Sequence, residues 1–411
     1  MSKWLGWLIW MMMLLSIGAQ AEEPSFAWHG FGDTYHALRC KDPYDFMSSR
    51  SRVRMELTAL KNETSLFVSI NAVSNRVLPD QDGLVLREAF LQYHFRNWDL
   101  KAGRQIIVWG VADALRLTDW ISPMDYTEFL AQDYDDIRVP VNAFRLTRSG
   151  TTWKVEMVMV PIPEFFIYSY DTQNPWSVLP ASAIICQRDT DNRPSKTIDH
   201  SEYGGRFSIF RNGFDLSVSV LHTWNKAPLL NQWISADHDT LHIRSEFGRM
   251  DLVGLDLSIP IGSWVVRGEM TGYRNDLIAR KLSDEYRSPL KKNTLAMLIG
   301  TDWYPGNEWT LTAQYFHRII PDHQADMAVD QHQAMATFGI TKKLLNTTLT
   351  LNSFTYFDLT YDGLFSRSSG EYALSDQIHL RLGYDLFHGD DGMFGLYRNN
   401  SEIWTKIRYG F

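Results

Sequence analysis

Apolar and polar side chains alternate along many short segments of this chain. In residues 50–57, for example, Val53 and Met55 alternate with arginines and a glutamate. Residues 401–411 repeat the pattern and stop on the aromatic Phe411. Because successive side chains of a strand point to opposite faces, a period of two predicts strands that separate an apolar from a polar environment. No helical period competes with it over comparable lengths.

Two kinds of connector separate these segments, and they alternate. Eight short ones lie near residues 61–62, 97–98, 149–150, 211–213, 260–262, 305–307, 346 and 375–376. Nine outer connectors, all long except the one near 361–362, lie near residues 39–47, 77–83, 110–140, 161–200, 224–239, 275–291, 321–331, 361–362 and 388–400. Tight turns on one side and long loops on the other are typical of outer-membrane barrels. The predicted fold is therefore all-β, a transmembrane antiparallel β-barrel of about 18 strands with both termini in the periplasm.

One segment leaves the strand number open. The apolar parity changes between Leu241 and Ile259, which either a β-bulge near Gly248 or a hidden turn with extra strands would explain. The strand number is therefore predicted as about 14 to 20.

Composition agrees with a barrel. Aromatic residues make up 13% of the chain, yet its mean hydropathy is −0.25. Trp and Tyr favour membrane interfaces, and only every second residue of a barrel strand meets lipid. No linker interrupts the chain, so residues 22–411 are predicted to form one domain in contact with outer-membrane lipid. Residues 1–21 combine Lys3, an apolar run and Ala19-Gln20-Ala21, which predicts a secretory signal peptide cleaved near Ala21 and a protein of the bacterial outer membrane.

The end of the chain resembles the closing-strand signal of bacterial outer-membrane barrels. In those proteins, a final Phe preceded by alternating apolar residues is read by the barrel-insertion machinery. Phe411 would have that role here, and the insertion machinery would be a partner. The closing strand is expected to pair with the segment near residues 28–38, so that no strand edge remains exposed.

Charged residues of the strands are assigned to the barrel interior, because a charge facing lipid near the membrane midplane costs ~2–4 kcal/mol. The pore-lining candidates are Arg50, Arg52, Arg54, Glu56, Glu88, Arg145, Lys154, Arg206, Arg267, Arg318, Arg381 and Arg408. Lys101 and Lys406 fall on the same face. The net charge is −8, yet this interior is cationic. The arginines could select solutes or only pair with neighbouring acids in the wall. Arg104 has the outward parity, which predicts a place at the rim or beside a bulge.

The connector 110–140 is too long to serve only as a connection. Its charged residues are candidates for a pore constriction: Asp113, Arg116, Asp119, Asp125, Asp133, Asp135 and Asp136. It could fold into the lumen opposite the arginines, or remain a solvated surface loop. The connector 161–200 carries many aromatic residues and is expected to pack inside the barrel mouth, or to act as a lid. Cys40 and Cys186 lie in connectors on one side of the barrel; they could form a disulfide or remain two thiols.

Two motifs carry a family resemblance. Gly103-Arg104-Gln105, Trp109-Gly110 and Pro123-Met124-Asp125 form the first, and residues 389–400 form the second. The chain resembles uncharacterised porin-like barrels of Gram-negative bacteria, including a domain-of-unknown-function family akin to alginate-export barrels. The resemblance implies an outer-membrane channel or exporter component.

The leading hypothesis is a porin-like channel for small polar or anionic solutes. The alternatives are the outer-membrane component of an export or lipid-transport system with periplasmic and inner-membrane partners, an outer-membrane enzyme, and a plugged structural barrel. The histidines show no metal-ligand spacing, and no phosphate-binding loop or nucleophile elbow is present. No enzymatic activity, cofactor, metal or nucleic-acid partner is therefore expected.

Overall fold

The computed structural model describes residues 23–130, 132–134, 136–179, 185–235 and 240–411. The predicted signal peptide and Asp135 lie outside the described residues.

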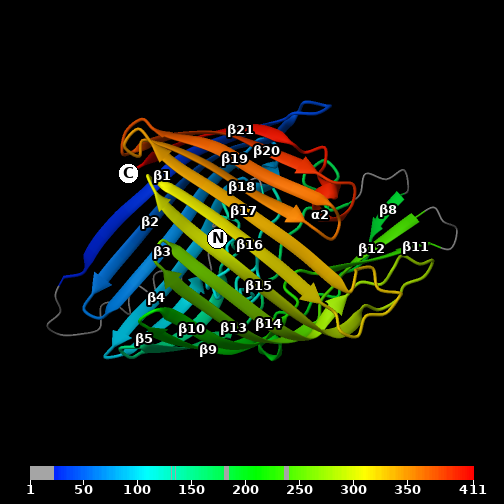
Figure 1. Ribbon diagram of the computed structural model, residues 1–411, viewed down its shortest axis with the longest axis horizontal. Helices are drawn as coiled ribbons and strands as arrows, with labels where there is room; N and C mark the ends of the chain where they lie inside the picture. Colours follow the sequence, from blue (N-terminus) through cyan, green and yellow to red (C-terminus); the bar gives the residue numbers. More distant parts are fainter. Residues whose placement is uncertain (1–22, 131, 135, 180–184, 236–239) are drawn as a thin grey trace.

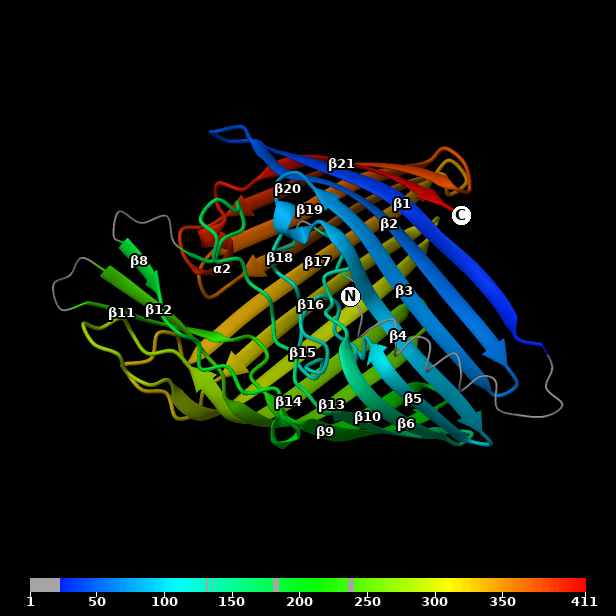
Figure 2. The same ribbon diagram turned by 180° about the vertical axis from the view of Figure 1, so that it is seen from behind.

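Eighteen strands form one closed antiparallel barrel (Figures 1 and 2). Each pairs with its neighbours along the chain, and β1 pairs with β21. The strands are β1 (Ser25–Arg39), β2 (Phe46–Lys61), β3 (Thr64–Asn75), β4 (Gly83–Phe95), β5 (Trp98–Gln105), β6 (Val141–Ser149), β7 (Trp153–Val160), β9 (Glu202–Arg211), β10 (Phe214–Trp224), β13 (Arg249–Ile261), β14 (Trp264–Ile278), β15 (Leu290–Gly306), β16 (Trp309–Ile319), β17 (His332–Leu344), β18 (Leu349–Asp358), β19 (Gly363–Ala373), β20 (Ile378–His388) and β21 (Glu402–Gly410). The predicted fold class and the central estimate of the strand number are confirmed.

The first and last strands close the barrel. Residues 31–39 of β1 pair with residues 402–410 of β21 in continuous register. The ladder continues to the last residue, because the Phe411 N–H donates to the Gly30 carbonyl oxygen at 3.0 Å and the Gly30 N–H donates back at 2.9 Å. The predicted partner of the closing strand is confirmed, and this closure leaves no free strand edge at the chain ends.

Side chains alternate between the two faces of the wall as the sequence pattern requires. On β2, Val53 and Met55 are 44% and 50% exposed, whereas Arg52 and Arg54 are buried inside the barrel. The eight short turns and nine outer connectors lie between the strands at the predicted places. The interior is thus the charged face, and the outer face is the apolar one.

A small sheet outside the barrel explains the parity change near Gly248. It consists of β8 (Ile185–Arg188), β11 (Leu229–Ile234) and β12 (Thr240–Glu246). The residues on the two sides of Gly248 therefore belong to different sheets, and of the two alternatives from the sequence the β-bulge is wrong. The hidden strands exist, but they lie in a loop and do not enlarge the barrel.

The helical segments are short. They are η1 (Pro79–Gln81), η2 (Ile198–His200) and α2 (Gly392–Leu396). Within the described residues, no helix is both long and apolar enough to cross a membrane.

Candidate functional site

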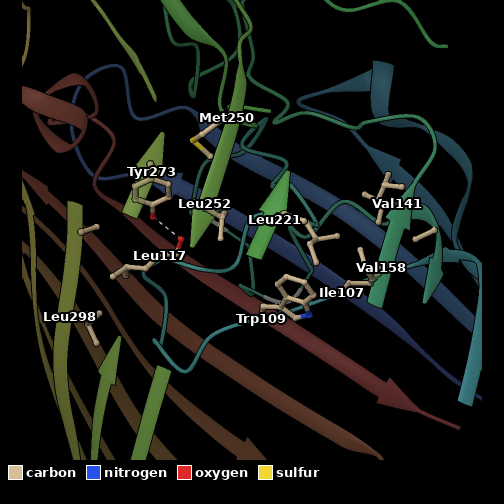
Figure 3. Close-up of a cluster of buried hydrophobic side chains, with 14 residues drawn as sticks. Ile107, Trp109, Leu117, Val141, Val158, Leu221, Met250, Leu252, Tyr273 and Leu298 are labelled. Carbon is tan, nitrogen blue, oxygen red and sulfur yellow. Dashed lines mark hydrogen bonds between the residues drawn. The ribbon is translucent and has the colours of Figure 1, made fainter. Parts of the chain in front are cut away.

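The connector between β5 and β6, residues 106–140, runs through the inside of the barrel, and we call it the lumen loop. Its side chains Ile107, Trp109 and Leu117 are almost completely buried. They pack against inward-facing apolar residues of the wall, shown in Figure 3: Val141, Val158, Leu221, Met250, Leu252 and Leu298. Burying an apolar side chain of this size stabilises by ~1.5–3 kcal/mol, so this cluster holds the first half of the loop in the lumen.

Two wall carboxylates fasten the same half of the loop. Glu269 of β14 accepts hydrogen bonds from the backbone N–H groups of Val111 and Ala112, both at 3.1 Å, and from that of Thr118 at 2.7 Å. Glu156 of β7 accepts the indole N–H of Trp109 at 2.6 Å. These bonds satisfy backbone and ring donors that the loop carries into the interior.

The arginines of β2 hold the second half of the loop. Arg52 and Arg54 both contact the carboxylate of Asp136 at 2.9 Å. Arg50 contacts Glu128 at 2.7 Å, and that pair is buried. The carboxylates of the loop therefore face the arginine ladder of β2, which consists of Arg50, Arg52 and Arg54. This agrees with one of the two alternatives that the sequence left open. A solvated surface loop does not describe this segment.

Asp133 ties the loop to the closing strand. Its carboxylate contacts Lys406 at 2.7 Å, Arg381 at 3.4 Å and Arg408 at 3.7 Å. Burial alone would raise the pKa of Asp133, but Lys406 and Arg381 outweigh it and lower this pKa to about 2. Asp133 is thus ionised at neutral pH and bridges three wall cations.

The other loop candidates have two kinds of role. Asp113 contacts the wall through Arg267 at 2.6 Å. Asp119 binds Arg138 within the loop at 2.6 Å, and Arg116 donates to backbone oxygens of the loop. Asp125 accepts the N–H of Thr127 at 2.9 Å, and burial raises the pKa of Asp125. Arg116, Asp119 and Asp125 therefore shape the loop, while Asp113, Asp133 and Asp136 attach it to the wall.

The remaining pore-lining candidates lie on the inner face of the wall, most with a carboxylate partner. The contacts are Glu56 with Ser69, Glu88 with the Ile106 N–H, Arg145 and Lys154 with Glu156, Arg206 with Asp256, Arg267 with Asp302, Arg318 with Asp276, Arg381 with Glu371, and Arg408 with Asp33. Ion pairs and hydrogen bonds within the wall and with the loop therefore account for most of these charged residues. Whether these residues select solutes stays a prediction.

Arg104 lies where the backbone is irregular. Gly103 before it has a φ of +131°, and a Cβ on Gly103 would meet the Ala89 carbonyl oxygen at 2.4 Å. The Nε–H of Arg104 donates to the Leu86 carbonyl oxygen at 3.2 Å. The outward parity of Arg104 predicted a place either at the rim or beside a bulge. Its position beside an irregularity of the wall agrees with the second of these alternatives.

Three cavities border the lumen loop. The largest, about 600 Å³, lies towards the short turns and is lined by Lys154, Arg206 and Arg267; we call it the vestibule. A second, about 350 Å³, lies between the loop and β2–β4; we call it the upper cavity. A third, about 210 Å³, has mostly apolar and aromatic lining. Arg138 lines both the vestibule and the upper cavity, so the loop stands between them.

The connector 161–201 also turns into the barrel mouth. Trp176 is fully buried and stacks on Phe129 of the lumen loop, with 6.1 Å between ring centroids. Packing inside the mouth thus describes its aromatic part. Cys40 is an exposed free cysteine, whereas the side chain of Cys186 lies outside the described residues, so the disulfide stays a prediction.

Sequence reasoning missed several interior residues. Asp33 of β1 binds Arg52 at 2.7 Å and Arg408 at 3.0 Å. Lys226 is fully buried against Glu202 at 2.5 Å. Asp33 could have been found from the strand register, since it lies opposite Arg52. No local pattern points to the Lys226–Glu202 pair, which joins a connector to a strand.

The closed barrel of eighteen strands, with short turns at one end and a connector folded into the lumen, is a porin-like β-barrel of the outer-membrane type. It is similar to OccK2 (OpdF) of Pseudomonas aeruginosa, solved in complex with glucuronate, with a TM-score of 0.54, 13% identity, and coverage of 94% of this chain and 97% of that chain. For OccK5 (OpdH) of the same organism, the TM-score is 0.52 and the identity 9%, with the same coverage. At these identities the likeness shows the fold alone.

The chain belongs to the family described as "Protein of unknown function (DUF1302)", which matches residues 44–381. This confirms the resemblance seen in the sequence motifs. No curated protein sequence matches the chain.

Proposed function

We propose that this barrel is an outer-membrane channel for small anionic or polar solutes, which move past the lumen loop. One observation carries the proposal: the wall residues that line the vestibule include three cations, Lys154, Arg206 and Arg267, and two carboxylates, Asp215 and Asp256. Arg145 and Lys154 share Glu156 at 4.0 and 3.7 Å. Lys101, on the neighbouring strand and directly opposite Arg145 in the ladder, forms no ion pair with any described residue. An anion entering here would meet positive potential before it reaches the loop.

Arg138 supports the same proposal, because it lines both the vestibule and the upper cavity. Its partner Asp119 belongs to the same loop, so this cation is fixed at the boundary between the cavities. A guanidinium held at the boundary between the two cavities favours passage of anions over cations.

We also infer that the barrel acts as a channel and not as an enzyme. Most charged groups of the interior are used in ion pairs between the loop and the wall, for example Asp133 with Lys406 at 2.7 Å. The protein would be exported, inserted in the outer membrane and supplied by periplasmic partners. A positive lipid-hydrolysis assay with the purified barrel would contradict the channel assignment.

Charge reversal in the vestibule tests the selectivity. The Lys154 side chain is 36% exposed, so Lys154→Glu should fold. In planar bilayers with a KCl gradient, this variant should shift the reversal potential towards that of potassium. Lys281→Glu, in the connector between β14 and β15, is the matched control and should leave it unchanged. Equal reversal potentials for wild type and Lys154→Glu would refute the role of this wall.

A further inference from the structure

The barrel wall is unusually low at β5, β6 and β7, which have 8, 9 and 8 residues. By comparison, β2 has 16 residues. Eight residues at ~3.3 Å each and a tilt of ~45° rise only about 19 Å along the membrane normal. The apolar band of an outer-membrane barrel is about 25 Å tall. If the turns of these strands lie at the periplasmic limit of that band, the upper edge of this part of the wall falls about 6 Å short of its outer limit.

Next to these short strands, the part of β4 nearer the long connectors, which we call its upper part, has no hydrogen-bonded neighbouring strand on the side of β5. β5 pairs with β4 only from residue 89 to residue 95, because the chain leaves the wall after Gln105 and enters the lumen. The upper part of β4, residues 83–88, pairs with β3 alone. Side chains replace the missing strand at two points, since Arg104 donates to the Leu86 carbonyl oxygen and Glu88 accepts the Ile106 N–H.

The upper cavity wraps around this free edge. Val85 lies opposite Asn71, an interior partner of Arg54, whereas Leu86 lies opposite the outward-facing Ile70. Both Val85 and Leu86 line the cavity. The cavity thus reaches the edge of β4 that no strand covers, beside the outward-facing Leu86.

The lining of the upper cavity combines an apolar rim with interior cations. Val85 and Ile167 at the rim are 46% and 44% exposed. Farther in lie the guanidinium groups of Arg50, Arg52, Arg87, Arg104 and Arg138, together with the carboxylates of Asp80, Asp82, Asp125 and Asp136. Arg104 forms no ion pair with any described residue, and its Nε–H donates to a neutral carbonyl oxygen, that of Leu86. A cation of this kind, at the edge of lipid, suits an anionic head group whose apolar chain stays in the membrane.

We propose that the upper cavity is a lateral binding site for a single-chain anionic amphiphile, such as a fatty acid, which enters from the outer leaflet between β4 and β6. The head group binds at Arg104 and Arg87, and the chain lies along Val85, Leu86 and Ile167. This site goes beyond the passage of small ions and does not require it. Chloride conductance, measured on the same preparations, tests the channel proposal separately.

Quenching by spin-labelled lipids tests the site. A fluorophore is attached at Leu84→Cys, on the rim of β4, in a protein with Cys40→Ser and Cys186→Ser, reconstituted in phosphatidylcholine vesicles. Doxyl stearic acid and its methyl ester are compared as quenchers, since both enter the bilayer but only the acid is charged. Ile299→Cys on β15, which is 62% exposed, is the matched control site.

The acid should quench the probe at position 84 at about fivefold lower concentration than the ester, whereas the two should be equal at position 299. Arg104→Gln should remove the preference for the acid. Ile167→Trp, which fills the cavity without a change of charge, should weaken quenching by the acid in the same way. Added dodecanoate should displace the labelled acid; displacement by phosphatidylglycerol instead would contradict the single-chain ligand. Equal quenching by acid and ester at position 84 would overturn the proposal.

Discussion

Replacement of Asp136 by Asn should release the second half of the lumen loop. Asp136 contacts Arg52 and Arg54 at 2.9 Å, and removal of one partner from a buried ion pair destabilises by ~3–5 kcal/mol. Arg52 keeps Asp33 at 2.7 Å and Arg54 keeps Asn71 at 2.8 Å, so the lower end of this range, about 3 kcal/mol, applies. That corresponds to an increase of about 100-fold in the population of the displaced segment.

The first half of the loop should remain in place. Ile107, Trp109, Leu117 and Ile121 are buried there, and at ~1.5–3 kcal/mol each they contribute about 6–12 kcal/mol. Loss of one anchor therefore loosens the segment near residue 136 without emptying the lumen. The substitution also removes one negative charge from the lumen and leaves Arg54 without its carboxylate partner, so the anion preference should rise.

Single-channel recordings in symmetric KCl measure the effect. Asp136→Asn should increase the open-channel conductance and its fluctuations, and a KCl gradient should show a stronger preference for chloride. Asp376→Asn, in the turn between β19 and β20, makes the same chemical change outside the lumen and should behave like wild type. If conductance, noise and reversal potential of Asp136→Asn all match those of wild type, the loop does not control the pathway.

Three further predictions concern stability, pH and assembly. Trp109→Ala should lower the free energy of unfolding by about 3–5 kcal/mol in urea titrations, because it leaves a cavity; the lipid-facing control Leu382→Ala should cost much less. The folded-state pKa of Asp133 is lowered from 3.8 to about 2. The stabilisation of the folded state by ionised Asp133 is therefore complete above pH 3.8 and is lost as the pH falls through about 2. Channel noise should stay constant from about pH 7 to 4 and increase near pH 2; an increase near pH 5 would contradict this reasoning. Phe411→Ala should slow the appearance of heat-modifiable folded barrel in cells, whereas Ile299→Ala should not, if the insertion machinery reads the last residue.

The strands could be predicted because their signal is local. Each wall residue meets either lipid or the interior, so the identities of Val53 and Arg52 alone reveal their faces. The positions of the short turns follow from the same reasoning. Asn62 and Asn307, for example, adopt positive φ angles of 51°, which Asn tolerates better than most residues.

Contacts between distant segments could not be predicted in this way. The sequence indicated that Asp136 could face the arginine ladder, but the choice between lumen and surface depended on an apolar patch of the inner wall. Val141 and Val158 contribute to that patch. Strand parity places them on the same faces as Arg145 and Lys154, but no local pattern shows that a distant connector packs against them. The segment 240–246 was also ambiguous, because a strand of a loop sheet alternates like a strand of the barrel.

The charge state of the interior required the complete set of pairs. The sequence left open whether Arg50, Arg52 and Arg54 select solutes or pair with neighbouring acids. In the structure, Asp33, Glu128 and Asp136 pair with them. The cations that remain outside ion pairs among the described residues include Lys101 and Arg104. The outward parity sets Arg104 apart in the sequence, but no local sign distinguishes Lys101 from its paired neighbours.

The ion preference of the wild-type barrel tests the central claim most directly. Purified protein in a planar bilayer, with a KCl gradient across it, yields a reversal potential whose sign identifies the preferred ion. Because Arg145 and Lys154 share one carboxylate, Glu156, beside the vestibule and Lys101 forms no ion pair with any described residue, we expect the potential to lie on the chloride side. A closed bilayer or a potential on the potassium side would contradict the account.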